Sequence, residues 1–290
     1  MWYGNVITNK WWGETWLKEA FADYIAYNIY KAYCDFVEAE ELKATNKGKP
    51  SGLVIQRSQL QDVDLVFMRK KLKGMCADGN PSDARAVYFD CEFNVFGTCG
   101  YGPQVYGKSV SELHEVIEML GGEKVFVEFS KNYLKDYQYQ AVSINEFNQS
   151  LMKAFQAFPN EKNQIFPIET ITEGAFYMKG IDTLTFEVDQ SRNVLQIRQR
   201  PSNMDSKADD IYRYHHFDVA LLNKESEVVG VVPVLMENDK LLEICIEKYP
   251  DFVHILPNYS NIGYFYYEFN EDERTYFRSE DALQKLDSKC

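Results

Sequence analysis

The sequence lacks several features that mark common classes of protein. No apolar run approaches the roughly 20 residues of a membrane-spanning helix, and no basic-then-apolar signal peptide opens the chain. The formal net charge of −13 argues against nucleic acid as a partner, because phosphate contacts need a basic surface. An acidic surface serves solubility and also suits a cationic ligand, such as the amino terminus of a peptide. We therefore expect neither a membrane segment in this chain nor a nucleic-acid partner.

Cysteine and histidine are too scattered to predict a metal site from their spacing. The six cysteines include no Cys-x-x-Cys pair. A bridge between Cys91 and Cys99 fits their spacing but is not established by it. Free thiols in a reducing compartment fit the pattern at least as well, which slightly favours a cytoplasmic location. The pair His215-His216 lies in a strand-like run, so its rings point to opposite faces and predict no shared metal site.

What the sequence does contain is ample apolar surface with two different periodicities. The 290 residues are 45% hydrophobic and 15% aromatic, enough for a sizeable core in one large or two ordinary domains. Helical spacing dominates the first part of the chain, and short runs that alternate between apolar and polar residues dominate the rest. About seven such strands with polar turns predict a small antiparallel sandwich.

One helical stretch, Trp11 to Tyr24, holds a carboxylate in apolar company. Glu19 stands among tryptophan, leucine, phenylalanine and alanine in WWGETWLKEAFADY. A carboxylate in an apolar helix costs free energy unless a hydrogen bond, a cation or a metal meets it. Glu19 therefore either reaches the surface or a lysine or arginine partner, or it binds a metal.

A resemblance over residues 2–24 favours the metal. The string WYGNVITNKWWGETWLKEAFADY resembles the aminopeptidase N-like zinc metallopeptidases, a gluzincin family that also contains leukotriene A4 hydrolase. The resemblance implies a zinc enzyme that removes amino-terminal residues from peptides, with Glu19 as the third zinc ligand. It also implies that a His-Glu-x-x-His helix, which carries the other two ligands and the general base, precedes Met1.

The sequence contains no substitute for that helix. The nearest string, His114-Glu115-Val116-Ile117-Glu118, has a glutamate in place of the second histidine, and we interpret it as an exposed helix face. One carboxylate cannot hold a catalytic zinc, which takes three protein ligands and a water. We therefore expect a truncated or internal piece of the enzyme, without zinc or turnover by itself and with the missing upstream half as its partner. The rival hypothesis is a non-catalytic protein that keeps the scaffold as a binding or assembly module.

A second site residue follows from the same resemblance. Tyr106-Gly107-Lys108-Ser109 is similar to the Tyr-x-Lys-Gly motif of the family, which implies that Tyr106 donates a hydrogen bond to the oxyanion of the tetrahedral intermediate. Ser109 departs from the family's glycine, and Lys18 and Ala20 depart from its Asn and Gly, which weakens the case for full activity. Lys18 adds a positive charge beside Glu19 in sequence, although we expect neighbouring helix positions to point apart.

The fold that we predict is α+β. It comprises the helical later half of a thermolysin-like catalytic domain in residues 1–170, a small antiparallel β-sandwich in 171–270 and a charged tail in 271–290. Three helices are expected between Val105 and Phe155, because Gly121-Gly122 ends an apolar stripe and Ser143 to Glu146 has the spacing of a capping box. Breaks at Pro159, Pro167 and Gly174 mark the boundary between the two domains.

Overall fold

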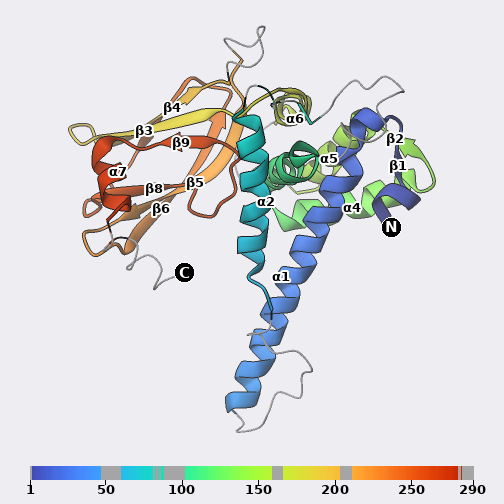
Figure 1. The fold of residues 1–290 in the computed structure, drawn as a ribbon, viewed down its shortest axis with the longest axis horizontal. Coiled ribbons are helices and arrows are strands. Elements are labelled where there is room, and N and C mark those ends of the chain that lie inside the picture. The colour runs from blue at the N-terminus through green and yellow to red at the C-terminus, as the bar shows by residue number, and fades with distance from the viewer. Residues whose placement is uncertain are drawn as a thin grey trace.

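The computed structural model describes residues 2–46, 60–80, 82, 84, 86–87, 102–158, 166–202, 211–279 and 282. A helical region comes first in the chain, and two β-sheets follow beside it (Figure 1). The helical region contains α1 (Trp16–Asn46), α2 (Val63–Asp78), α3 (Ser109–Leu120), α4 (Glu123–Tyr137), α5 (Ile144–Gln156) and α6 (Ile168–Tyr177), the short turns η1 (Trp2–Val6), η2 (Trp12–Glu14) and η4 (Gln104–Lys108), and the paired strands β1 (Thr8–Asn9) and β2 (Ala141–Val142). The sheets contain β3 (Thr183–Asp189), β4 (Val194–Arg200), β5 (Tyr214–Leu222), β6 (Val228–Glu237), β7 (Leu241–Cys245), β8 (His254–Pro257) and β9 (Tyr266–Glu268), and α7 (Glu271–Phe277) follows them. The α+β class is thus confirmed. The possible bridge between Cys91 and Cys99 is not tested, because both residues lie outside the described residues.

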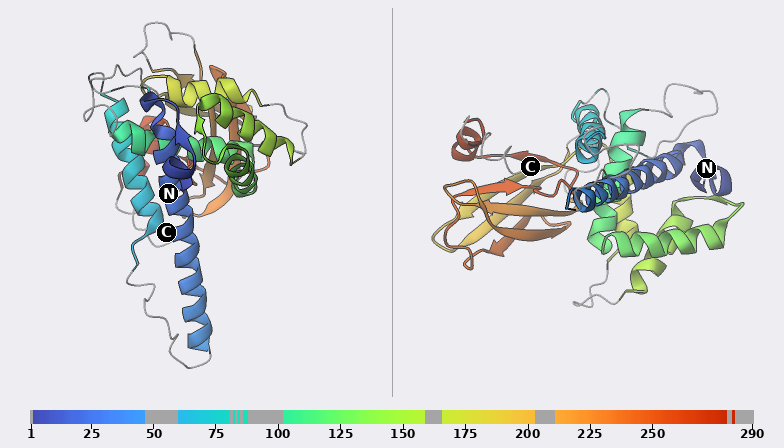
Figure 2. Two further views of the ribbon diagram at one scale, coloured as in Figure 1. Left: turned by 90° about the vertical axis from the view of Figure 1, so that its right-hand side faces the viewer. Right: turned by 90° about the horizontal axis from the view of Figure 1, so that it is seen from below.

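Helix α1 is 31 residues long and changes character along its length. Trp16, Ala20 and Phe21 in its first turns are fully enclosed. Further along, apolar side chains such as Ile29 and Phe36 are exposed, and the far end of the helix projects from the rest of the molecule (Figure 2). The predicted helix around Glu19 therefore exists. Beyond its first turns, buried residues such as Cys34 and Val37 alternate with exposed apolar ones.

The three helices predicted between Val105 and Phe155 are confirmed as α3, α4 and α5. Helix α3 ends at Gly121, whose φ of 122° is open to glycine and strained for other residues. Helix α5 begins with the predicted capping box, in which Ser143 and Glu146 satisfy each other's backbone amides. Local sequence signals thus set the ends of these helices.

Helix α3 lies at the centre of the structure, in contact with α1, α4, α6, η4 and β5. Most of its residues are buried, including Glu112 and Glu115. The interpretation of His114 to Glu118 as an exposed helix face is therefore wrong. Polar residues suggested a solvated face, but Glu115 meets His215 and the Tyr264 amide on the elements packed around this helix instead.

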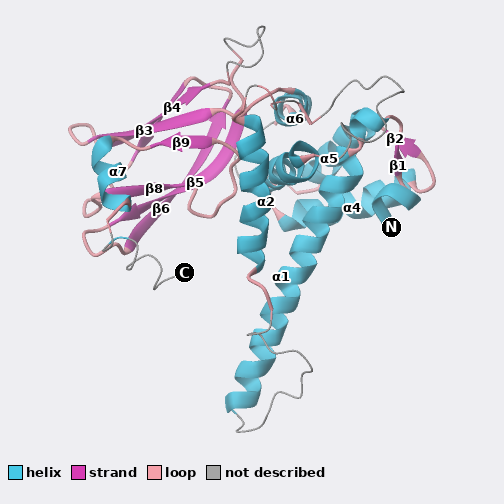
Figure 3. Ribbon diagram, viewed as in Figure 1, coloured by secondary structure: helices cyan, strands magenta, loops and turns pink. Residues whose placement is uncertain are grey.

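The strands form a four-stranded sheet in the order β7-β4-β3-β9 and a three-stranded sheet in the order β6-β5-β8 (Figure 3). A turn that follows Asp189 joins β3 and β4 into an antiparallel hairpin. Apolar residues of both sheets, such as Phe186 and Phe217, make one shared core, as in a sandwich. The prediction of an antiparallel sandwich is wrong at one edge, because β9 pairs with β3 in parallel.

The expected break between helices and strands contains a helix. Helix α6 begins after Pro167 and runs through Gly174, and its residues Ile171 and Phe176 belong to the helical core. The thermolysin-like assignment and the domain limits 1–170, 171–270 and 271–290 stay predictions. Helix α7 in the last segment is capped by the preceding residue, Asn270, whose side chain accepts a hydrogen bond from the Glu273 amide at 2.8 Å. No helix in the described parts of the chain has the length and apolar character to cross a bilayer.

Candidate functional site

Glu19 sits in the first turn of α1, on a backbone held by aromatic packing. The Trp16 ring stacks on Phe176 with centroids 3.9 Å apart. Phe21 stacks on Tyr3 at 4.6 Å and lies 5.4 Å from Phe129. Such close ring contacts favour one arrangement of the surrounding helices. The position of Glu19 is therefore fixed by the buried residues that flank it, and not by its own side chain.

The Glu19 carboxylate itself is partly exposed and meets a cation. Its side chain is 21% exposed, and Oε1 lies 3.7 Å from the Lys18 Nζ. The expectation that Lys18 points away is therefore wrong, because its long side chain bends back toward Glu19 and also lies 5.7 Å from the Trp12 ring centroid. The simpler interpretation of Glu19, a surface carboxylate with a lysine partner, agrees with this geometry.

Tyr106 lies in η4, the turn that leads directly into α3. Its side chain is half-buried and packs against the helical core. The next residue, Gly107, approaches the backbone of α2 so closely that an added Cβ would lie 2.5 Å from the Lys70 carbonyl oxygen. Likewise, a Cβ added to Gly74 on α2 would lie 2.6 Å from the Lys108 amide nitrogen. Two glycines thus allow the backbones of η4 and α2 to touch. This contact fixes the position of the backbone from which the Tyr106 side chain projects.

The structure brings the elements that carry Glu19 and Tyr106 together. Helix α1 and η4 are in contact, and α2 contacts both. A pocket of about 220 Å³ lies between α1, α2 and the start of α3. Its lining includes Asp23, one helical turn after Glu19, and Val110, one turn after Tyr106. An ion pair of 2.7 Å between Asp23 and Lys70 joins α1 to α2 at this pocket.

A catalytic zinc needs three protein ligands and an open position. Among the residues that the structure describes, no group of three or more His, Cys, Asp or Glu side chains could hold a metal ion. Glu19 offers a single carboxylate as a ligand, and the charged group beside it is the Lys18 ammonium, which cannot bind a metal ion. The described residues therefore do not fit a catalytic zinc by themselves.

A group of buried charged side chains lies elsewhere, where the helical region meets the sheets. We call Asp78, Lys108, Glu115, Asp182, Arg213 and His215 the buried charge cluster, because all six are buried and linked by contacts. The Lys108 Nζ lies 2.7 Å from Asp78 Oδ2, and both side chains are fully enclosed. The same Nζ donates to the carbonyl oxygens of Met178 and Gly180, each at 3.1 Å. This pair joins α2 and η4 to the segment that leads into β3.

His215 forms the other half of the buried charge cluster. Its Nδ1 lies 3.2 Å from Glu115 Oε1 on α3, and its Nε2 lies 3.3 Å from Asp182 Oδ2. Glu115 Oε2 also accepts a hydrogen bond from the Tyr264 amide at 2.7 Å. Arg213 donates from Nη1 to the Gly180 carbonyl at 3.0 Å, and its Nε lies 3.8 Å from Asp182 Oδ1. Side chains far apart in the sequence thereby tie the central helix to both sheets.

These contacts change the protonation of the groups that make them. Burial disfavours the His215 cation, but the Glu115 and Asp182 carboxylates outweigh it and raise the pKa of His215 to about 10. Burial, followed by repulsion from Glu115, raises the pKa of Glu112 to about 8. At neutral pH the imidazole is therefore charged between two carboxylates, while Glu112 holds a proton.

Sequence reasoning did not find the buried charge cluster. Lys108 belongs to the Tyr-x-Lys motif, which was the one available signal. Glu115 and His215 are a hundred residues apart, and nothing local to either shows that they meet. His215 and His216 do point to opposite faces, as predicted: the first is buried in this cluster, and the second lines another pocket.

Comparison with known proteins adds to the geometry. Residues 1–173 match the Peptidase family M1 domain. Aminopeptidase Q of Acinonyx jubatus is 23% identical over 190 residues, which cover 64% of this chain and 16% of that protein. Aminopeptidase Ey of Gallus gallus is 25% identical over 210 residues, or 69% of this chain and 19% of the relative. Tricorn protease-interacting factor F2 of Thermoplasma volcanium is 20% identical over 294 residues, or 99% of this chain and 30% of the relative.

The chain spans less than a third of the length of each of these relatives. The family match covers more than half of the chain and includes Glu19 and Tyr106. It confirms the resemblance drawn from residues 2–24. The chain belongs to peptidase family M1.

Proposed function

We propose that the chain contains the later half of the catalytic domain of a zinc-dependent aminopeptidase, followed by a β-sandwich domain, and that the enzyme acts on peptides with a free amino terminus. Glu19 is the third zinc ligand, and Tyr106 donates a hydrogen bond to the oxyanion that forms during hydrolysis. The observation that carries the proposal is the placement of these two motif residues. They come from distant parts of the sequence, yet they lie on contacting elements, and the residues one helical turn after each of them, Asp23 and Val110, line the same pocket.

The described residues supply one zinc ligand and no glutamate in the general-base position of a His-Glu-x-x-His helix. When bound, a catalytic zinc polarises the scissile carbonyl and activates a water. The role of this chain is to hold Glu19 rigidly through its aromatic neighbours and to present Tyr106 from η4. The complementary half, with the His-Glu-x-x-His helix, is the partner that completes the site. We expect the isolated chain to show neither stoichiometric zinc nor turnover.

The alternative is a non-catalytic member of the family that serves as a binding or assembly module. One observation favours it: the Glu19 carboxylate already has the Lys18 ammonium as a neighbour, 3.7 Å away. A cation in that place competes with a metal for the carboxylate.

The deciding measurements are the mass of the native protein in its source cells and the zinc content and aminoacyl-anilide hydrolysis of that species. A species far heavier than 33.8 kDa, with zinc and turnover, is the result expected from the peptidase proposal. In that species Glu19→Gln should release zinc, whereas Tyr106→Phe should keep zinc and lower kcat by roughly 10²–10³-fold.

Matched controls are available on the same scaffold. Glu38→Gln changes an exposed carboxylate further along α1, and Tyr139→Phe changes an exposed tyrosine after α4; both should leave zinc and kcat unchanged. A native species of 33.8 kDa without zinc would overturn the peptidase proposal and support the binding module. One tightly bound zinc on the isolated chain would contradict the proposal that the partner half supplies the other ligands.

A further inference from the structure

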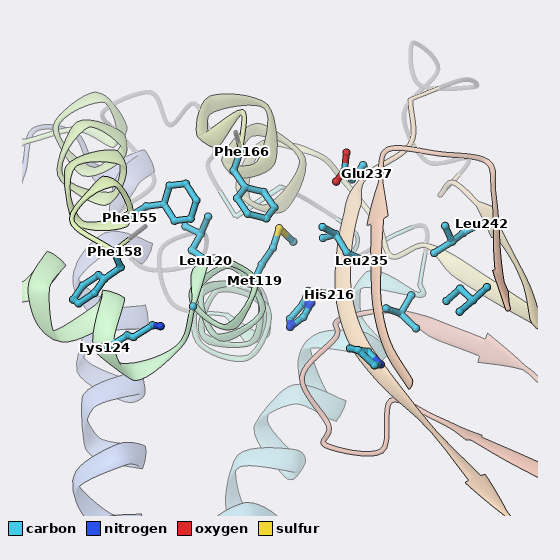
Figure 4. Close-up of a pocket in the computed structure, with 14 residues that line it drawn as sticks. Met119, Leu120, Lys124, Phe155, Phe158, Phe166, His216, Leu235, Glu237 and Leu242 are labelled. Carbon is cyan, nitrogen blue, oxygen red and sulfur yellow. The ribbon is translucent and has the colours of Figure 1, made fainter. Parts of the chain in front are cut away.

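A second and larger pocket lies between the helical region and the sheets (Figure 4). Its volume is about 490 Å³, within the range of about 300–1,000 Å³ that is usual for small-molecule sites. Met119 and Leu120 at the end of α3 line it, whereas Tyr106 immediately precedes the start of α3. A helix of this length spans about 18 Å, so this pocket is distinct from the pocket between α1 and α2, which is lined by Val110 near the start of α3.

Two walls of different origin enclose the pocket. The helical wall includes Phe155, Phe158 and Phe166, and in Figure 4 their rings lie on one side of the space. Phe155 and Phe166 meet edge to face at 5.4 Å. The opposite wall comes from β5, β6 and β7, with Leu235 facing the rings across the space. An apolar ligand between the walls would remove aromatic and aliphatic surface from water, which favours binding.

Few charged or titratable groups reach this pocket. Among the lining residues that the structure describes they are Lys124, His216 and Glu237. The Lys124 side chain points into the space, and its Nζ lies 5.8 Å from the centroid of the Phe158 ring. Glu237 lies at the opposite end of the view in Figure 4. Burial lowers the pKa of His216 despite the neighbouring Glu115 carboxylate, so this imidazole is neutral at pH 7.

We propose that this pocket binds a small apolar acid, with its hydrocarbon or aryl part between the phenylalanine rings and Leu235 and its carboxylate at Lys124. The orientation follows from the charges, because Lys124 attracts the carboxylate and Glu237 at the far end repels it. His216 lines the apolar middle and presents no charge there. The proposal does not depend on the peptidase function, since it uses neither Glu19 nor Tyr106.

The test is isothermal titration of the full chain with decanoate, decanol and decylamine, three ligands with the same apolar chain and different head groups. We expect one saturable site for decanoate, at least about tenfold tighter than for decanol, and weaker binding still for decylamine. Lys124→Glu should weaken decanoate binding by at least about tenfold. Lys131→Glu makes the same charge change at an exposed site on the same helix, outside the pocket, and should leave binding unchanged.

A second variant tests the apolar part. Leu235 is half-buried, and Leu235→Trp should fill the space and abolish binding of all three ligands while the thermal midpoint without ligand stays close to that of the unmodified chain. Equal affinities for the three head groups would overturn the proposal. So would equal losses in Lys124→Glu and Lys131→Glu. Binding of an apolar peptide with a free carboxyl end, without binding of decanoate, would also overturn it and assign the pocket to peptides.

Discussion

Glu19 and His215 show two ways in which this chain holds a charged side chain. Glu19 is partly exposed, its cation partner lies 3.7 Å away, and only its backbone is held tightly. His215 is buried, with a carboxylate within 3.3 Å of each ring nitrogen. Strongly shifted pKa values often indicate catalysis. The shift of His215 instead accompanies contacts that join helix α3 to the sheets. The comparison teaches that the ionic contacts of His215 hold the helices and the sheets together.

The largest effect should come from breaking the Lys108–Asp78 pair. Lys108→Met leaves the Asp78 carboxylate buried without its cation, so the free energy of unfolding should fall by about 3–5 kcal/mol. Urea denaturation measures this loss. Adding Asp78→Asn should recover part of it, because no unpaired charge then remains. Lys131→Met, at an exposed site, should change stability by no more than about 0.5 kcal/mol. If the double variant is as unstable as the sum of the single losses, the unpaired charge is not the cause.

A smaller effect, visible only as a function of pH, should come from His215. Its pKa in the folded chain, about 10, lies above the ordinary value of 6.5, so the folded state holds a proton that the unfolded state releases between these values. The stabilisation is therefore complete below pH 6.5 and is lost as the pH rises through about 10. We expect a fall of about 2–4 kcal/mol in the free energy of unfolding over that interval, and a flatter curve for His215→Gln.

The groups around His215 decide how this curve is interpreted. Glu115 on α3 and Asp182 before β3 face the ring, and Arg213 lies beside Asp182. The pKa of Glu112 is raised to about 8, so its contribution to the free energy of unfolding also falls as the pH rises toward that value. The difference between the natural chain and His215→Gln isolates the imidazole. His254→Gln serves as control: burial lowers the pKa of His254, so this variant should not flatten the fall above pH 6.5. Parallel curves for the natural chain and His215→Gln would contradict the prediction.

Some features of the fold could be predicted from the sequence, and others could not. Gly121 and the pair Ser143 and Glu146 act on neighbouring backbone, so the helix ends they predict are confirmed. Glu115 carries no such local signal. Its partner His215 comes a hundred residues later, and only the packing of α3 against β5 brings them together. An exposed face and a buried ionic contact look alike in a sequence, because both are written with charged residues.

The residues of the candidate site were predicted from motifs and not from local signals of helix ends. Motif positions identified Glu19 and Tyr106, and the structure places them on contacting elements. The direction of the Lys18 side chain was not predictable, because a flexible four-carbon stem reaches a neighbour that the helical wheel places elsewhere. The edge where β9 joins β3 in parallel was missed for a related reason. Strand pairing between distant segments is set by the whole fold and not by either segment.

The smallest effect should come from Glu19 itself. Because its ion pair with Lys18 lies near solvent, Glu19→Gln should change the free energy of unfolding of the isolated chain by less than about 1 kcal/mol. Trp16→Ala, one turn earlier, should cost about 3–5 kcal/mol, because the ring is fully buried against Phe176. The same urea titration measures both variants. A loss above about 2 kcal/mol for Glu19→Gln would give this carboxylate a structural role and remove the contrast with His215.

The contact between Gly74 and Gly107 has a consequence for how this protein tolerates mutation. Because the two segments meet through backbone atoms, their spacing does not depend on which side chains surround them. Neighbouring positions can therefore vary in size and still leave the turn that carries Tyr106 where it is. Substitution of either glycine forces the two backbones apart by a distance that no nearby side chain can recover. The position of Tyr106 is thus sensitive to substitution of the two glycines and tolerant of substitution at neighbouring positions that carry side chains.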